Sequence, residues 1–243
     1  MRLKDTLRRR WPWLLLIVPV ALVIVVWGAT FIYIHFIAPD PAPRLTFSEV
    51  TTTTLAPGAT TGSSAAPAPA TVDGTWTVAA GSRAGYRVSE VLSGQDNEAT
   101  GRTTAVTGQL VISGTTVNTA TFSVDMTKVA SGESQRDNQF RNRIMNTSQF
   151  PTATFALTSP IELTSVPANL VEITAKASGK LTLHGTTKEI TIDLKARRNG
   201  ASLEINGTVP ITFSDYGISN PSGGPASVGD NGEMEFLIIL TRA

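Results

Sequence analysis

The 243-residue sequence contains no cysteine and only two histidines. The absence of cysteine excludes disulfides, zinc–thiolate sites, iron–sulfur clusters and thiol nucleophiles. Charged residues make up only 16% of the chain and are balanced, with 20 Lys and Arg against 19 Asp and Glu, so a nucleic-acid binder with a broad basic surface is not expected. With 41% hydrophobic residues, the chain is too apolar for a disordered protein and long enough to bury one core.

Motifs that would carry catalysis are also missing. The sequence has no G-x-S-x-G, H-E-x-x-H or P-loop pattern. His35 falls in an apolar run and His184 precedes Gly185 in a predicted hairpin turn, so a general base of the usual type has no candidate. Two histidines without cysteine also argue against a transition-metal site. We therefore expect no enzyme, cofactor or metal, although a site built only from carboxylates stays open.

The N-terminal part of the chain has the pattern of a membrane anchor. Residues 1–10 carry five basic residues and one acidic residue, and the 24 residues of 14–37 are dominated by apolar side chains. A helix of that length reaches roughly 36 Å, slightly more than the roughly 30 Å hydrocarbon core of a bilayer. We predict a cytoplasmic basic segment at 1–13 and a single-pass transmembrane helix at 14–38, with the remainder extracytoplasmic by the positive-inside rule. A cleaved signal peptide is the alternative, but its apolar region usually runs only about 7 to 15 residues.

Residues 39–72 differ sharply in composition from the segments on either side. Six prolines are scattered among Thr, Ser, Ala and Gly, and residues 51–54 are all threonine. Such a segment has too little apolar surface to form a core. The composition predicts a largely disordered linker that holds the following domain off the membrane.

Residues 73–243 repeatedly alternate apolar and polar side chains over short segments bounded by Gly, Ser, Asn or Pro. This period of two is typical of half-buried antiparallel strands. The predicted strands are 75–78, 83–88, 109–112, 121–124, 154–157, 170–174, 180–184, 189–195, 202–213 and 235–240. The segment Ser134–Met145 breaks the pattern and places Phe140 and Ile144 four residues apart, which predicts a short helix. The number of strands favours a single barrel or sandwich.

Several stretches in this region, in order and spacing, resemble the YceI-like family of bacterial lipid-binding proteins. They are Trp76–Val78, RDNQFR at 136–141, QFPTATF at 149–155, GKLTLHGTTK at 179–188 and Asp215–Ile218. The resemblance covers essentially all of 73–243. It implies a mainly β fold, an extended lipocalin-like antiparallel β-barrel of about eight strands with a short helix, whose apolar lumen holds an isoprenoid or other amphiphilic lipid. Because YceI-like barrels are often dimers, it also makes a homodimer one expected arrangement.

Candidate ligand-binding residues fall into two groups. Apolar side chains are candidates for lining the lumen, with ordinary core packing as the alternative for each: Trp76, Tyr86, Phe122, Phe140, Ile144, Phe155, Leu157, Leu181 and Phe213. Polar side chains of the predicted helix are candidates for contacting an anionic head group, with a solvated helix face as the alternative: Arg136, Asn138, Arg141 and Arg143. The alternation does not identify which strand face lines the lumen.

Two classes of function stay open. The first is a membrane-anchored extracytoplasmic protein that sequesters or carries an isoprenoid or other amphiphile. The second is a structural or interaction module whose barrel is filled by its own side chains and whose surface binds an envelope partner. A reproducible co-purifying amphiphile would support the first class, whereas a void-free barrel from which nothing is extracted would support the second.

Overall fold

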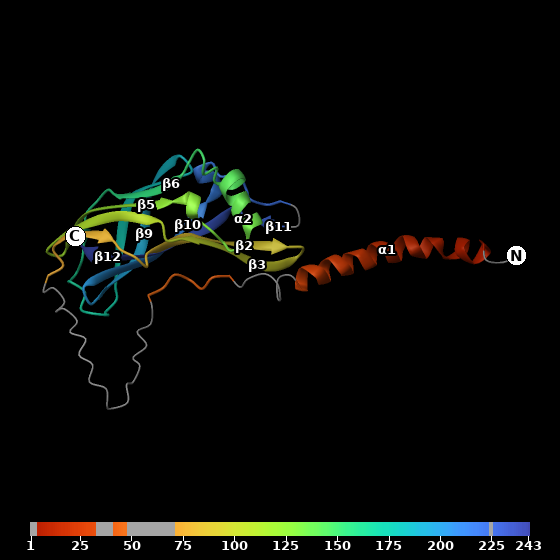
Figure 1. Ribbon diagram of the computed structural model, residues 1–243, viewed down its shortest axis with the longest axis horizontal. Helices are drawn as coiled ribbons and strands as arrows, with labels where there is room; N and C mark the ends of the chain where they lie inside the picture. The colour runs from red at the N-terminus through yellow and green to blue at the C-terminus, as the bar shows by residue number, and fades with distance from the viewer. Residues whose placement is uncertain (1–3, 33–40, 48–70, 224–225) are drawn as a thin grey trace, which may run out of the picture.

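The computed structural model describes residues 4–32, 41–47, 71–223 and 226–243, with side chains described from residue 18 onward. Helix α1 (Lys4–Ile32) precedes the β domain and extends beyond one end of it (Figure 1). Within these ranges, no helix meets the combined length and apolarity that a membrane span requires. The predicted cytoplasmic and transmembrane segments extend into 1–3 and 33–38, and most of the predicted linker, 48–70, also lies outside the described residues.

The described part of the β domain contains twelve strands and four short helical segments or turns, one of them a π-helical turn. The strands are β1 (Gly74–Val78), β2 (Arg83–Leu92), β3 (Gln95–Thr103), β4 (Val106–Ser113), β5 (Thr116–Asp125), β6 (Thr152–Leu157), β7 (Ile161–Glu162), β8 (Ile173–Leu183), β9 (Thr186–Asn199), β10 (Ser202–Thr212), β11 (Ala226–Val228) and β12 (Asn231–Arg242). The helical segments are η2 (Met126–Lys128), α2 (Ser134–Gln139), η3 (Phe140–Ile144) and η4 (Phe213–Tyr216).

Eight of these strands form a closed antiparallel barrel, which confirms the predicted mainly β fold. Their order is β1-β4-β5-β6-β8-β9-β10-β12, and β12 pairs back to β1. One edge of β12 is shared by two strands: residues 233–237 pair with β2, and 240–242 pair with β1. Strand β2 continues into an antiparallel hairpin with β3. At the end of the barrel where β12 begins, the β2–β3 hairpin therefore extends the wall.

Alternation along β12 separates the inside of the barrel from its outer wall. Met234, Phe236 and Ile238 face the lumen, because they line internal cavities. Leu237 lies on the opposite face, where it belongs to a separate small apolar cluster. Successive residues of a strand point to opposite faces, so Glu235 also belongs to the outer wall.

The helix predicted at Ser134–Met145 is confirmed, with a change of geometry in its middle. The first six residues are α-helical, and η3 then widens into a π-helical turn in which Met145 N donates to Phe140 O at 2.8 Å. The carboxylate of Asp137 accepts hydrogen bonds from Ser131 N at 2.8 Å and Ser131 Oγ at 2.7 Å. These bonds fix the start of the helix against the preceding loop.

Three sequence-based expectations are corrected. The predicted strands 170–174 and 180–184 are parts of one longer strand, β8, which begins at Ile173 after Leu170 adopts a left-handed conformation with φ 62°. Strand β3 was not predicted at all. Residues 39–72 were expected to form a largely disordered linker without a core, yet Leu45, Phe47 and Val72, among the described residues of this segment, are buried.

Candidate functional site

Two adjoining cavities occupy the lumen of the barrel. The deep cavity, of about 150 Å³, lies between the sheet walls, and the mouth cavity, of about 420 Å³, opens beside α2, η3 and β11. The wall residues common to both are Ala84, Val124, Ala153 and Met234. The volume of the mouth cavity falls within the range of roughly 300–1,000 Å³ that is typical of small-molecule sites. The barrel is therefore not filled by its own side chains.

The deep cavity has an almost entirely apolar wall. Four of the predicted lumen residues line it: Phe122, Phe155, Leu157 and Leu181. Arg197 and Glu235 also border it, but their charged groups are engaged on the outer wall. Arg197 Nε donates to Glu204 Oε2 at 2.6 Å, and Glu235 Oε1 accepts from Arg102 Nη2 at 2.7 Å. The deep cavity therefore offers shape and apolar contact but few polar groups to a ligand.

Glycines in neighbouring strands give the aromatic rings their places against the barrel wall. A Cβ on Gly179 would clash with the ring of Phe155, and a Cβ on Gly101 would clash with the ring of Tyr86. The ring in each case covers the backbone of the neighbouring strand. Because these rings lie along the wall, they leave space in the lumen.

The other four lumen residues that the structure brings to a cavity lie at the mouth. Tyr86, Phe140, Ile144 and Phe213 all line the mouth cavity. The rings of Tyr86 and Phe140 stack with centroids 5.0 Å apart and an interplanar angle of 13°. Burial raises the pKa of Tyr86 to about 12, against a smaller opposing effect of Arg136. The hydroxyl at the mouth is therefore neutral at physiological pH.

The rim of the mouth cavity is polar and carries more acidic than basic groups. Glu90, Glu133 and Arg136 all border it. Arg136 Nη2 lies 3.3 Å from Glu90 Oε1, which also accepts a hydrogen bond from Asn97 Nδ2 at 2.6 Å. The positive charge of Arg136 is therefore already paired, and Glu133 adds a negative charge.

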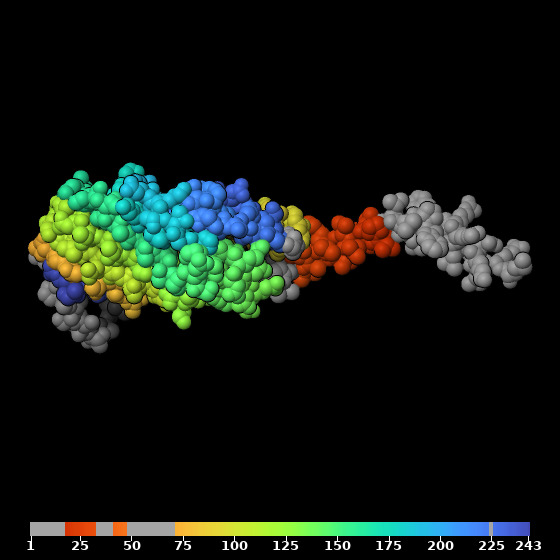
Figure 2. Space-filling view, turned by 90° about the horizontal axis from the view of Figure 1, so that it is seen from above, coloured from red at the N-terminus to blue at the C-terminus, as the bar shows by residue number. Residues whose placement is uncertain are grey.

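The structure does not gather the four predicted head-group residues at one site. Arg136 lines the mouth cavity, whereas Asn138, Arg141 and Arg143 do not. Arg141 Nη2 donates to Asn138 Oδ1 at 3.1 Å. Arg143 Nη2 donates to the carbonyl of Pro221 at 2.7 Å, which fastens η3 to the segment before β11. Figure 2 shows the same arrangement on the surface, with the α2–η3 region beside the segment leading to β11 at the end nearer α1.

Trp76 is the one predicted lumen residue that lines neither cavity. Its side chain is fully buried, and its Nε1 donates to the carbonyl of Val72 at 2.7 Å. Trp76 therefore packs the domain at the end away from α2. Sequence reasoning also missed the cavity residues Met234 and Phe236, although their alternation along residues 234–238 was a usable signal.

Comparisons with known proteins agree with this architecture. A family model described as the YceI-like domain matches residues 76–240. A polyisoprenoid binding domain from Saccharophagus degradans, implicated in plant cell wall breakdown, superimposes with a TM-score of 0.56 at 16% identity, covering 69% of this chain and 98% of that one. BcnA from Burkholderia cenocepacia gives a TM-score of 0.52 at 20% identity, covering 67% of this chain and 98% of that one. No curated protein matches the sequence.

Proposed function

This chain belongs to the YceI-like domain family, and we propose that it binds an isoprenoid or similar amphiphilic lipid in the lumen of its barrel. The observation that carries the proposal is the pair of adjoining cavities, one apolar and deep, the other open beside a polar rim. Each methylene-sized unit removed from water would contribute about 0.8 kcal/mol. The same ligand class is named for the similar domain from Saccharophagus degradans. The function is binding or transport of a lipid rather than catalysis.

The charges at the mouth favour a ligand with an uncharged polar head group. An anionic head group near Arg136 would compete with Glu90 for the guanidinium and would be repelled by Glu133. Gln135 and Gln139, which also border the mouth cavity, can donate to or accept from a hydroxyl or carbonyl. An isoprenoid alcohol or a quinone-like lipid has this chemistry.

We also propose that residues 14–38 anchor the barrel to a bacterial cell membrane, with 1–13 in the cytoplasm and the barrel outside it. The support is the uncharged apolar run of the sequence together with its basic N-terminal flank. Large apolar side chains are also exposed along the described part of α1: Val18, Val20, Leu22, Val23, Ile24, Val25, Val26, Trp27, Phe31 and Ile32. Exposed apolar surface of this extent requires a lipid or protein partner.

The lipid-binding proposal is tested by closing the junction between the cavities. Ala153 is 2% exposed and borders both cavities, whereas Ala156, on the same strand, is exposed. Ala153→Phe places a ring inside the lumen, and Ala156→Phe adds the same volume on the outer wall. The full-length chain and both variants are purified from bacterial membranes, and organic extracts are compared by mass spectrometry.

The expected result is an amphiphile that co-purifies with the wild type and Ala156→Phe and is lost from Ala153→Phe. Overpacking typically costs about 1–3 kcal/mol, so circular dichroism and thermal melts must show that Ala153→Phe is folded. If that variant is unfolded, Ala175→Leu narrows the deep cavity with a smaller added volume. Undiminished lipid in a folded, lumen-blocked variant would refute binding inside the barrel.

A further inference from the structure

Residues 41–47, here called the strap, lie along the outer wall of the barrel over β2, β3 and β12 (Figure 1). Leu45 is 8% exposed and Phe47 is 7% exposed, and both form an apolar cluster with Leu237 on the outer face of β12. The guanidinium of Arg197 lies 4.5 Å from the centre of the Phe47 ring, a cation–π contact. The C-terminal end of the strap is therefore packed against the barrel.

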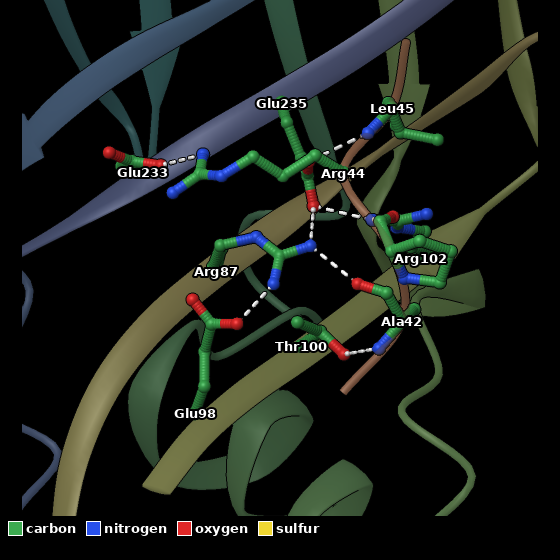
Figure 3. Close-up of polar contacts among 10 residues, drawn as sticks. Ala42, Arg44, Leu45, Arg87, Glu98, Thr100, Arg102, Glu233 and Glu235 are labelled. Atoms are coloured by element: carbon green, nitrogen blue, oxygen red, sulfur yellow. Dashed lines mark hydrogen bonds and ion pairs between the residues drawn. The ribbon is translucent and has the colours of Figure 1, made fainter. Parts of the chain in front are cut away.

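The backbone of the strap donates hydrogen bonds to side chains of the barrel. Ala42 N donates to Thr100 Oγ1 at 3.1 Å, and Leu45 N donates to Glu235 Oε2 at 3.1 Å (Figure 3). Strap residue Arg44 also forms an ion pair with Glu233 at 2.6 Å. These contacts come from side chains of β3 and β12, so the strap is bound by the wall itself.

Two arginines of the wall bind the carbonyls of the strap. Arg87 Nη2 donates to Ala42 O at 2.5 Å, and Arg102 Nη2 donates to Pro43 O at 2.5 Å. Both guanidiniums also contact Glu235 Oε1, at 3.2 and 2.7 Å. The same carboxylate therefore organises the two arginines and accepts the amide of the strap through its other oxygen (Figure 3).

The burial of these charged groups indicates a built docking site. The side chains of Arg87 and Glu235 are only 5% and 2% exposed, although they belong to the outer wall of a barrel. Removing charged groups from water is unfavourable unless partners replace the lost hydration. The backbone groups of Ala42 and Leu45 supply part of that replacement. The wall is therefore adapted to an extended peptide with free carbonyl and amide groups.

The strap runs in the same direction as β12 and begins toward the mouth of the barrel. Arg44 contacts Glu233 near the start of β12, and Phe47 packs with Leu237 farther along that strand. The start of β12 pairs with β2, whose hairpin with β3 lies at the mouth end. The chain that leads from α1 therefore reaches the barrel on the side of the mouth.

Docking of the strap also shortens the covalent tether between α1 and the barrel. With the proposed anchor at 14–38, only residues 39–40 separate the span from the docked strap, and fully extended they bridge at most roughly 10 Å. If the strap were released, the tether would run from residue 39 to 71 and could reach roughly 120 Å. The docked strap therefore restricts both the distance of the barrel from α1 and the end that faces it.

We propose that the strap is an intramolecular ligand of the outer wall that holds the mouth of the lumen against the bilayer. This inference rests on the proposed membrane anchor. The surface that meets the lipid is the mouth end, where Val91 is 38% exposed at the β2–β3 hairpin and Leu92 borders the mouth cavity. A lipid could then pass between the bilayer and the lumen without crossing water.

The test measures which end of the barrel lies near the membrane. Because the chain has no cysteine, single labels can be placed by Val91→Cys at the mouth and by Thr115→Cys in the β4–β5 turn at the opposite end. The full-length chain is reconstituted into phosphatidylcholine vesicles that contain head-group nitroxide lipids. Fluorescence quenching of each label then reports its proximity to the bilayer surface.

The strap is released by Leu45→Ser together with Phe47→Ser, and the matched control is Pro41→Ser together with Thr46→Ser, whose side chains are exposed. In the wild type and control we expect strong quenching at the mouth label and weak quenching at the far label. The release variant should lose that difference, and its strap amides should lose protection from hydrogen exchange. Extracted lipid should stay unchanged, because neither Leu45 nor Phe47 lines a cavity.

Equal quenching at both ends while the strap amides remain protected would overturn the proposal, as would a quenching difference that survives release. Failure of the full-length chain to float with the vesicles would refute the anchor, and the orientation with it. Absence of any extracted lipid would instead refute lipid binding and leave the quenching result to stand. The outcomes therefore distinguish failure of the strap proposal from failure of the proposed membrane anchor and from failure of the proposed lipid binding.

Discussion

Truncation of Phe140 to alanine should destabilise the barrel substantially, because the ring joins the helical segment to the lumen. Phe140 is 7% exposed and belongs to the apolar core together with residues of β8 and β10. Its ring stacks on that of Tyr86 at 5.0 Å, and a part of its surface borders the mouth cavity. The substitution removes both the burial of the ring and the stacked pair.

The size of the effect follows from those surroundings. Truncation of a buried phenylalanine typically costs about 3–5 kcal/mol, of which an aromatic pair accounts for about 0.5–1.5 kcal/mol. The Phe140 ring already faces a cavity on one side, so its surroundings make fewer contacts than a fully packed core. We therefore expect a loss of about 3 kcal/mol, near the lower end of the range. For a domain of this size that corresponds to a fall in Tm of about 6–12 °C.

Thermal and urea unfolding of the full-length chain in lipid nanodiscs would measure this loss. The fluorescence of Trp76, which is fully buried, reports unfolding of the barrel. The control is Asn142→Ala on the same helical segment, whose side chain is exposed and which should change stability by less than about 0.5 kcal/mol. A loss below about 1 kcal/mol for Phe140→Ala would refute the packing that we assign to this ring.

Two further predictions concern the mouth of the lumen. Because the pKa of Tyr86 is raised to about 12, the unfolded chain loses this proton first, so stability present below pH 10 should fall by about 2 kcal/mol as the pH rises from 10 to 12. The free energy of unfolding of Tyr86→Phe should lack this fall between pH 10 and 12. Identical pH profiles of unfolding for the wild type and Tyr86→Phe would contradict the prediction. An isoprenoid alcohol should bind about tenfold more tightly than its phosphate, a difference of ~1.4 kcal/mol. Arg136→Gln should widen that preference and Arg141→Gln should leave it unchanged in a competition assay, whereas preferential binding of the phosphate would exclude an uncharged head group.

The barrel could be predicted because its walls have one apolar and one polar face. Eight of the nine predicted lumen residues line a cavity. Period-two alternation predicted the apolar strand positions, and the i, i+4 spacing predicted Phe140 and Ile144, but the face that lines the lumen was identified only by the structure. Trp76 is the exception, because alternation does not tell a residue that packs the end of the barrel from one that borders its space. Strand β3 escaped detection because QDNEATGRT contains few of the β-branched or aromatic residues that mark strands. It forms because its backbone pairs along nearly the whole of β2.

The polar rim could not be read from the sequence, because its partners lie far apart in the chain. The arginines of the 134–145 segment suggested a cationic rim, but Arg136 pairs with Glu90, 46 residues earlier. Arg143 similarly binds the carbonyl of Pro221, 78 residues later. The net charge at the mouth depends on which strands the barrel brings together. Local composition of the helix therefore predicted arginines near the mouth but not that Arg136, the one that lines the mouth cavity, is paired with Glu90.

The composition of residues 41–47 did not predict the strap, but the sequence of β12, the strand that the strap covers, does indicate an external partner. The run Phe236–Leu240 is apolar at every position, although a barrel wall exposed to solvent should alternate. Such a run is typical of a strand covered on both faces, so it requires something outside the barrel to shield its outward side chains. The structure supplies that cover: Leu237 lies under the strap, and Ile239 lies against the turn at Gly81. In a barrel strand, an apolar residue on the expected outer face therefore predicts an external partner, and here the chain itself provides it.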